Sequence, residues 1–473
     1  MPHMEVDLDT RIPNNVNLKG DKRLLRALEH WQPQFIEWWK EMGPSDFNAD
    51  SVYLRTAVGV GKGGWAHFDH VKMPDYRWGI FLAEPTDDRK IHFGDHVGDQ
   101  AWDQVPGEMR NRLRRLIVTQ GDTEPASVEQ QRLLGHTAPS LYDMRSLFQV
   151  NAEEGRHLWA MVYLLHVFFG SDGRDEAEEL LARRSGNADK PRILEAFNQP
   201  VETWLDFFCF TTFTDRDGKY QLASLAESGF SPLAYSTQFM LTEEAYHMQT
   251  GENGIGRIVH RTGELMREGT DPRKVGAIPF DIIQRYINFW ASMSMDLFGG
   301  EDSTNAAEAF AMGLKGRYRE SDGIYKDPKA LGQNYKLSVP KNGGMTEQDV
   351  PLRRAMNSLL LDAYVADSTR IVNRWNRDLE RLDMDVRISL PDKKFHRGQG
   401  VYAGYWFNPA GERITEEEWN AHRDDWLPTE ADSAYVKTCM ISVREPGKFA
   451  NWISPPHQGT NEQPNDFDYV RFH

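Results

Sequence analysis

Two copies of the motif Glu-x-x-His, each preceded by another carboxylate, constrain the fold of this chain more than any other feature. The first copy pairs Glu154 with His157 and follows Glu124 by 30 residues. The second copy pairs Glu244 with His247. Residues at positions i and i+3 of a helix share one face, so each copy can offer one oxygen and one nitrogen atom to a metal ion. The repeat therefore predicts two similar helical hairpins whose carboxylates and imidazoles face one another.

Three aspartates compete for the carboxylate position that precedes the second copy. Asp215 stands 29 residues before Glu244, nearly the interval found in the first half, and we favour it over Asp206 and Asp217. Two helices that carry Glu-x-x-His and two that carry a single carboxylate form the ligand set of dinuclear iron or manganese proteins. Carboxylates and imidazoles suit either of these metals. The residues predicted to bind two metal ions are Glu124, Glu154, His157, Asp215, Glu244 and His247.

A second glutamate, Glu153 or Glu243, comes directly before the ligand glutamate of each copy. A metal-bound histidine usually donates its other N–H group to a carboxylate. We expect Glu153 to accept this hydrogen bond from His247. Glu243 would accept the corresponding bond from His157, and the alternative for both glutamates is a position facing solvent.

The substrate side of such a site has two candidate features. Gln120 stands one helical turn before Glu124 and can donate a hydrogen bond to a substrate carbonyl or to an oxygen atom at the metal. An ordinary interior glutamine is an equal alternative. The phenylalanines of residues 204–213 can wall an apolar pocket, and their alternative is a plain place in the core.

The rest of the chain is expected to be helical in the middle and mixed at its ends. Apolar spacing predicts helices over residues 24–42, 106–124, 140–170, 200–214, 231–249, 278–297, 305–319 and 350–382, with a charged connection over 171–191. Strands and loops are expected over 52–82, where 59–64 forms a plain glycine loop because it lacks the Lys-Ser/Thr pair of a phosphate loop. Strands and turns are expected again from Asp385 onward. We therefore divide the chain into a mixed extension that packs on the bundle (1–105), a helical metal-binding core (106–383) and a β-rich extension (384–473).

Charge, cysteine content and hydropathy exclude several classes of protein. The formal net charge of −16 argues against nucleic-acid binding, because the neutralisation of phosphates requires a basic surface. The chain has two cysteines, Cys209 and Cys439, which exclude a thiolate-built zinc or iron–sulfur site and indicate a reducing compartment. The longest apolar run, residues 158–170, is too short to span a bilayer, and the start of the chain shows no secretory signal. We expect a soluble cytoplasmic protein without a membrane partner.

On these residues the chain resembles the ferritin-like di-iron oxygenases, and more narrowly the family of oxygenase components of benzoyl-CoA epoxidases. The resemblance extends over the whole length, and its specific motifs are Glu-Glu-Gly-Arg-His at 153–157 and Glu-Glu-Ala-Tyr-His at 243–247. An aspartate at position 215, in place of the more usual glutamate, fits the family as well. The resemblance implies a mainly α fold, a ferritin-like four-helix di-iron bundle with extra helices and β-containing N- and C-terminal extensions.

The same resemblance implies an activity. Members of the family use two iron ions, dioxygen and NADPH electrons from a separate reductase that contains flavin and an iron–sulfur cluster. They convert benzoyl-CoA to its 2,3-epoxide in aerobic benzoate catabolism. The phosphoryl groups of CoA would need local cations on an acidic protein. Candidates, each of which can also be part of a solvated face, are Arg112, Arg114, Arg115, Lys326, Lys329, Lys336 and Lys341.

Three other classes remain open from the sequence. A di-iron monooxygenase or desaturase that acts on another acyl-CoA or aryl-CoA thioester would keep the same ligands. A ferritin-like iron-storage or ferroxidase protein shares the bundle but is normally far shorter. A helical scaffold without enzymatic activity would bind no stoichiometric metal.

Overall fold

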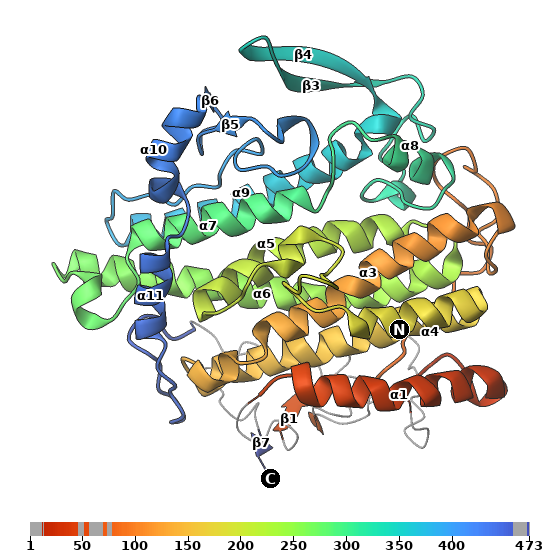
Figure 1. The fold of residues 1–473 in the computed structure, drawn as a ribbon, viewed down its shortest axis with the longest axis horizontal. Helices are drawn as coiled ribbons and strands as arrows, with labels where there is room; N and C mark the ends of the chain where they lie inside the picture. Colours follow the sequence, from red (N-terminus) through yellow and green to blue (C-terminus); the bar gives the residue numbers. More distant parts are fainter. Residues whose placement is uncertain are drawn as a thin grey trace.

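Four long helices lie side by side at the centre of the molecule (Figure 1). They are α3 (Arg110–Gln131), α4 (Leu141–Ala182), α5 (Trp204–Ala226) and α6 (Ser231–Arg267). Helix α3 packs along α4 and α5 packs along α6, and α4 also contacts α6, so the two hairpins face one another. The computed structural model describes residues 12, 14–45, 52–55, 70–72, 78–456 and 471–472.

The remaining helices cover this bundle on two sides. Helix α1 (Lys22–Met42) packs against α4, and its buried Trp31 and Phe35 meet the indole ring of Trp159. On the opposite side, α7 (Phe280–Asp296) and α9 (Met356–Arg381) cover α5 and α6 (Figure 1). The protein is thus mainly helical, as the sequence predicts, and its apolar core is continuous from α1 to α9.

Close approach of α5 and α6 depends on small residues in α6. A Cβ atom at Gly254 would lie 2.1 Å from Cδ1 of Phe208, and one at Gly251 would lie 2.5 Å from the backbone nitrogen of Thr212. Neither position can therefore hold a larger residue without displacement of the helices. This contact places the two carboxylate-bearing faces of α5 and α6 next to each other.

Several helices are longer than the sequence predicts. Helix α3 was expected to end near Glu124 but continues through Pro125. Packing along α4 compensates for the backbone hydrogen bond that a proline cannot donate. Helix α4 continues over most of the expected connection at 171–191, with a kink at Gly170, where φ is 62°. Helix α5 extends eleven residues beyond Asp215, so this carboxylate lies in the middle of a helix.

The strands form small sheets at the edges of the molecule. Strand β1 (Val52–Arg55) pairs antiparallel with both β2 (His70–Lys72) and β7 (Arg471–Phe472), which joins segments near the two ends of the chain. The expected glycine loop at 59–64 lies outside the described residues. A hairpin of β3 (Asn334–Lys341) and β4 (Gly344–Pro351) was expected to be loop and helix start. Its turn has positive φ at Asn342 and Gly343, which is the conformation that a two-residue hairpin connection requires.

The segment after Asp385 contains more helix than we expected. Its strands β5 (Trp406–Phe407) and β6 (Arg413–Ile414) have two residues each, whereas α10 (Glu416–Trp426) and α11 (Glu430–Cys439) are longer. The prediction of a β-rich segment is therefore wrong for its described part. Aromatic and β-branched residues suggested strands, but each helix begins with a capping box that the prediction overlooked.

One more helix differs from its expected bounds. Helix α8 (Thr304–Ala311) was expected to reach residue 319, but the chain turns at Gly313 with φ of 69°. The segment after this turn is bound to α5, where the N–H of Gly316 donates to the carbonyl oxygen of Ser224 at 3.1 Å. This brings Lys315 to the bundle, which matters for the cavity described below.

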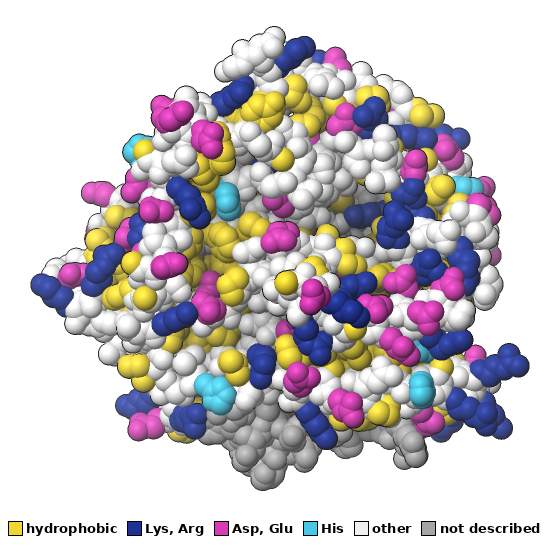
Figure 2. Space-filling view, in the orientation of Figure 1, with side chains coloured by type: hydrophobic (Ala, Val, Ile, Leu, Met, Phe, Trp, Pro, Cys, Tyr) yellow, Lys and Arg dark blue, Asp and Glu magenta, His cyan; other side chains and the backbone are white. Residues whose placement is uncertain are grey.

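The surface carries both signs of charge. On the face shown in Figure 2, acidic and basic side chains are interspersed, and lysines and arginines gather where the start of α3 approaches α8. None of the described helices has an apolar stretch of the length that a bilayer crossing requires.

Candidate metal centre

The six residues predicted as ligands meet in the middle of the bundle. Glu124 comes from α3, Asp215 from α5, and one Glu-x-x-His pair comes from each of α4 and α6. All six are buried, with at most 7% of the residue exposed. Among the described residues, two groups have ligand atoms within 4.8 Å of one another, and Glu154 belongs to both. These groups are Glu124, Glu154 and His157, and Glu154, Asp215 and His247.

Two carboxylates span the space between the imidazoles. The Oε2 and Oε1 atoms of Glu154 lie 3.7 Å and 3.4 Å from Nδ1 of His157 and of His247, respectively. Glu244 repeats this arrangement from the opposite hairpin, at 3.6 Å and 3.5 Å. Glu124 approaches only the first imidazole, at 3.3 Å, and Asp215 belongs to the group around the second. Glu154 and Glu244 therefore lie between the two imidazoles, whereas Glu124 and Asp215 each belong to one side of the cluster.

Several of these buried atoms have no hydrogen-bond partner within the described part of the chain. They are Nδ1 of both histidines, Oδ2 of Asp215 and Oε2 of Glu244. Buried polar groups normally find a partner, so four orphaned atoms that point into one small space indicate a missing ligand. Four carboxylates also match the charge of two divalent cations. The residues present thus fit a dinuclear metal centre, in both donor type and arrangement.

The outer glutamates pair crosswise with the imidazoles, as we expected. Nε2 of His247 lies 2.8 Å from Oε2 of Glu153, and Nε2 of His157 lies 2.8 Å from Oε2 of Glu243. Both glutamates are fully buried, so the solvent-facing alternative is wrong. These contacts hold each imidazole with Nδ1 directed at the cluster.

Two further side chains, which the sequence analysis missed, support the outer glutamates. Nε of Arg156 donates to both oxygens of Glu243, at 3.0 Å and 2.8 Å, and its Nη2 forms a buried ion pair with the same carboxylate. Nε2 of Gln149 donates to Oε1 of Glu153 at 2.7 Å. Arg156 lies inside the first motif and the helical position of Gln149 is one turn before Glu153, so both could have been considered from spacing.

Burial and crowding of charge shift the pKa values of the cluster. Burial raises the pKa of Glu154 to about 7. Burial, together with the charges of Glu154 and Glu244, raises the pKa of Asp215 well above its usual value. Burial alone would lower the pKa values of the imidazoles, but the surrounding carboxylates outweigh it and raise them. Without metal the cluster therefore holds protons near neutral pH, and these are the protons that bound cations would displace.

The two rival aspartates have other partners. Asp206 closes a capping box with Thr203 at the start of α5 and accepts a hydrogen bond from Nε1 of Trp290 at 3.1 Å. Asp217 accepts from Nε2 of Gln221 at 2.9 Å. Neither belongs to the metal-ligand groups found among the described residues. The geometry thus brings Asp215, and not its rivals, to the cluster.

Gln120 lies beside the cluster and contacts one of its carboxylates. Its Nε2 donates to Oε1 of Glu124 at 3.0 Å, and the Thr123 hydroxyl lies 3.3 Å from the same oxygen. The glutamine also lines a cavity. It is therefore placed to orient Glu124, and it does not have the purely backbone contacts of an ordinary interior glutamine.

A cavity of about 300 Å³ opens directly onto the cluster. Four of the six ligand residues line it, namely Glu124, Glu154, Asp215 and Glu244. The phenylalanines at 207, 208, 210 and 213 do not line it; of their two predicted alternatives the plain place in the core holds, between α5, α6 and α7. Among the described residues that line the cavity, Phe197 is the one aromatic side chain.

Cations surround part of this cavity. Arg112 and Arg115 line it, whereas Arg114 forms an ion pair with Asp172 outside it. The four lysine candidates between residues 326 and 341 are not among its described lining residues. Lys315, which was not a candidate, does line it, and its Nζ donates to Oε1 of Gln221 at 2.5 Å. Nothing in the sequence around Lys315 predicts this contact, because the turn at Gly313 brings it there.

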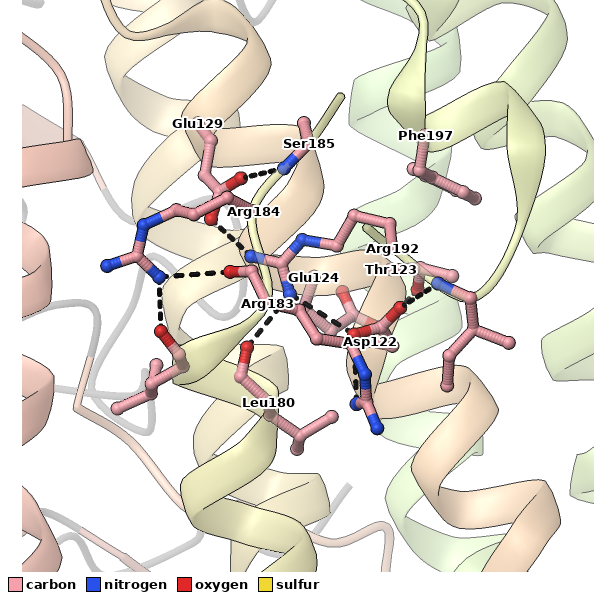
Figure 3. A network of polar contacts seen from close by, with 12 residues as sticks. Asp122, Thr123, Glu124, Glu129, Leu180, Arg183, Arg184, Ser185, Arg192 and Phe197 are labelled. Carbon is pink, nitrogen blue, oxygen red and sulfur yellow. Dashed lines mark hydrogen bonds and ion pairs between the residues drawn. The ribbon is translucent and has the colours of Figure 1, made fainter. Parts of the chain in front are cut away.

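A buried cluster of charged residues lies behind α3 and was also missed. We call it the Arg192 cluster, and Figure 3 shows its members Asp122, Glu129, Arg183 and Arg192. Nη1 of Arg192 donates to Oδ1 of Asp122 at 3.1 Å and to the carbonyl oxygen of Leu180 at 2.8 Å, and its Nη2 pairs with Glu129. The cluster thereby ties α3, which carries Glu124 and Gln120, to the end of α4 and to the loop that follows.

The helices and the buried cluster define a class, namely helical-bundle proteins with a candidate dinuclear metal centre. No protein-family model matches the chain. The benzoyl-CoA oxygenase component B of Aromatoleum evansii is 54% identical to it over 472 residues, which cover 99% of this chain and 100% of that protein. At this identity and coverage, the chain belongs to the benzoyl-CoA oxygenase component B family. The resemblance stated from the two motifs is thereby confirmed.

Proposed function

We propose that this protein is the oxygenase component of a ferritin-like di-iron enzyme that epoxidises benzoyl-CoA to 2,3-epoxybenzoyl-CoA in aerobic benzoate catabolism. The observation that carries the proposal is the pair of inward-facing imidazole nitrogens without hydrogen-bond partners, with two carboxylates between them that line a cavity. The relative that is 54% identical is named for benzoyl-CoA and as component B, which supports both the substrate and a partner component.

Six side chains would hold the two iron ions, namely Glu124, Glu154, His157, Asp215, Glu244 and His247. The bound ions would supply the reduction of dioxygen and the transfer of one oxygen atom. The overall reaction balances when benzoyl-CoA, dioxygen, NADPH and a proton give the epoxide, water and NADP⁺. The chain has no thiolate cluster of its own, and NADPH electrons would come from a separate reductase with flavin and an iron–sulfur cluster.

The protein's own side chains have three tasks in this reaction. Glu153 and Glu243 keep the Nε2–H groups of the ligand imidazoles oriented, so that each Nδ1 faces the carboxylates of the cluster, where metal ions would bind. Gln120 orients Glu124 by its hydrogen bond and faces the substrate in the cavity. The apolar part of the cavity wall excludes water from the bound ring.

The thioester would enter with its aryl end toward the cluster. Arg112 and Arg115 lie at the part of α3 that approaches α8, where Figure 2 shows basic side chains at the surface. Arg115 is exposed and Arg112 is half-buried, so they can meet phosphoryl groups that stay outside. Lys315 lies in the cavity wall and can donate to the inner part of the CoA chain.

The test is iron content and turnover in two histidine variants of the same helix. The parent chain should bind two iron ions and, with a reductase and NADPH, consume benzoyl-CoA. His157→Ala should lose iron and turnover, because it removes one imidazole ligand. His166→Ala is the matched control, since His166 also lies on α4 but bonds the carbonyl oxygen of Val162 outside the cluster. Normal iron content and full turnover in His157→Ala would refute the ligand assignment.

A further inference from the structure

In the described part of the chain, the aromatic side chain that lines the cavity does not come from the phenylalanine-rich helix. Phe197 lies in the short helix η5 (Glu195–Asn198), in the loop between α4 and α5. Its ring meets that of Phe210 edge to face, with ring centroids 5.9 Å apart and an interplanar angle of 77°. Phe197 is 6% exposed and lines the cavity together with Leu194 of the same loop.

The loop that carries Phe197 is attached firmly to the back of α3. The N–H of Ile193 donates to Oδ2 of Asp122 at 2.7 Å, and Nε2 of Gln130 donates to the carbonyl oxygen of Phe197 at 2.8 Å. Within the loop, Nδ2 of Asn198 donates to the carbonyl oxygen of Arg192 at 3.0 Å. Figure 3 shows Phe197 on this loop beside the Arg192 cluster, with Thr123 and Glu124 of α3 nearby.

This attachment links the wall to the metal ligands through one helix. Asp122 faces the loop, and Glu124, two residues later on α3, faces the metal cluster. The distance between the aromatic wall and the cluster is therefore set by a single rigid element. Rigid placement of this kind is what selection between similar substrates requires.

We propose that Phe197 is a specificity-determining residue, which recognises the aromatic ring of the thioester by ring–ring contact. The inference rests on the proposed function and deepens it, because it assigns to one side chain the preference for thioesters with an aromatic ring over those with a saturated ring. Aromatic rings attract one another in edge-to-face or offset geometry, whereas a saturated ring of similar size offers only apolar area. An aromatic side chain in the wall of the cavity that the ligand carboxylates also line thus favours benzoyl over cyclohexanecarbonyl thioesters.

The experiment compares binding of three ligands to the full, metal-loaded chain without dioxygen, by titration calorimetry. The ligands are benzoyl-CoA, cyclohexanecarbonyl-CoA and CoA itself. The parent chain should prefer benzoyl-CoA to the alicyclic thioester by about tenfold, as expected for a good ring–ring contact. Phe197→Leu keeps an apolar side chain and should reduce this preference to less than about threefold, with unchanged affinity for CoA.

Two further variants separate specificity from folding. Phe197→Ala should also admit 2-naphthoyl-CoA, because it enlarges the cavity next to Leu194. Phe168→Ala is the matched control, since Phe168 has a comparable edge-to-face partner in Phe230, at 5.0 Å, but does not line the cavity. It should keep the preference of the parent chain.

The outcomes distinguish the two claims. If Phe197→Leu keeps the parent preference for benzoyl-CoA, the role of Phe197 is refuted and the proposed function stands. If the parent chain binds neither thioester, both the proposed function and this inference are overturned. A reduced preference in both Phe197→Leu and Phe168→Ala would also overturn the inference, because the effect would not be local to the cavity.

Discussion

Replacement of Arg192 by Met should destabilise the fold through the two carboxylates that it leaves behind. The Arg192 side chain has no solvent exposure, and it pairs with Asp122 and Glu129, which are 2% and 6% exposed. Methionine replaces the aliphatic stem of arginine and carries no charge, so the substitution removes the guanidinium group while it keeps the packing of the stem. The perturbation is therefore mainly electrostatic.

The remaining contacts decide the magnitude. Asp122 keeps the N–H of Ile193 at 2.7 Å and a more distant Arg183 at 3.4 Å. Glu129 keeps the neutral donors Ser185 N–H, at 2.8 Å, and Nε1 of Trp38, at 3.4 Å. Removal of one partner from a buried ion pair costs about 3–5 kcal/mol, and these surviving donors place the loss at ~3 kcal/mol, the lower end of that range.

This loss converts into a modest thermal shift, because the chain is long. An unfolding entropy of about 2.1 cal/mol/K per residue gives roughly 1 kcal/mol/K for 473 residues, so Tm should fall by about 3 °C. Scanning calorimetry of the metal-free chain measures the change. Iron binding should weaken as well, because the Arg192 cluster holds α3, which carries the ligand Glu124, in place.

A second substitution tests the cause. Glu129→Gln in the Arg192→Met background removes the unpaired charge and should restore about half of the lost stability or more. The Glu129→Gln variant alone completes the double-mutant cycle. A fall in Tm of less than 1 °C in Arg192→Met would refute this reasoning. So would a double variant whose loss of stability exceeds the sum of the losses in the two single variants.

Three further predictions concern the ligands and the bundle. Asp215→Ala should lose iron, whereas Asp206→Ala on the same helix should keep two iron ions and lose about 1 kcal/mol as a broken cap, as measured by metal analysis and calorimetry; iron loss in both variants would contradict the assignment. Apparent affinity for Co²⁺ should fall as pH drops through about 7, since the raised pKa of Glu154 means that a proton must leave before metal binds, and constant affinity between pH 6 and 8 would argue against this. Gly254→Ala should lower stability by about 1–3 kcal/mol through overpacking, whereas Gly218→Ala, with no atom within 4 Å of the new Cβ, should raise it by up to ~1 kcal/mol; equal Tm changes would contradict the close helix contact.

The centre of the site was predictable because its chemistry is local in sequence. A Glu-x-x-His pair needs only helical periodicity to place both ligands on one face. Asp215 followed from the near-equal intervals, and the crosswise glutamates from the usual support of metal-bound histidines. These inferences required no knowledge of loops or of helix crossing.

The cavity was not predictable, because its walls come from segments that are distant in sequence. Lys315 arrives through a turn after α8, and Phe197 through a loop tied to α3. The phenylalanines of α5 suggested a pocket, but that helix is surrounded by α6 and α7, and they became core. Composition identifies apolar surface without indicating which neighbour covers it.

The predicted ends of several helices were wrong for a similar reason. Pro125 and Gly170 are local signals for a helix end, yet packing along the bundle carries α3 and α4 past both. Conversely, α10 and α11 begin at capping boxes within a segment rich in residues that favour strands. Tertiary contacts outweigh local preference in the first case, and the capping signal was overlooked in the second.

The most direct test of the account is a single turnover with labelled dioxygen. The full chain, loaded with ferrous iron and reduced, would be exposed to ¹⁸O₂ and benzoyl-CoA, and the thioester product would be weighed by mass spectrometry. The account predicts one ¹⁸O atom in the ring of the product and the other in water. Oxidation of the iron with recovery of unlabelled, unchanged benzoyl-CoA would contradict it.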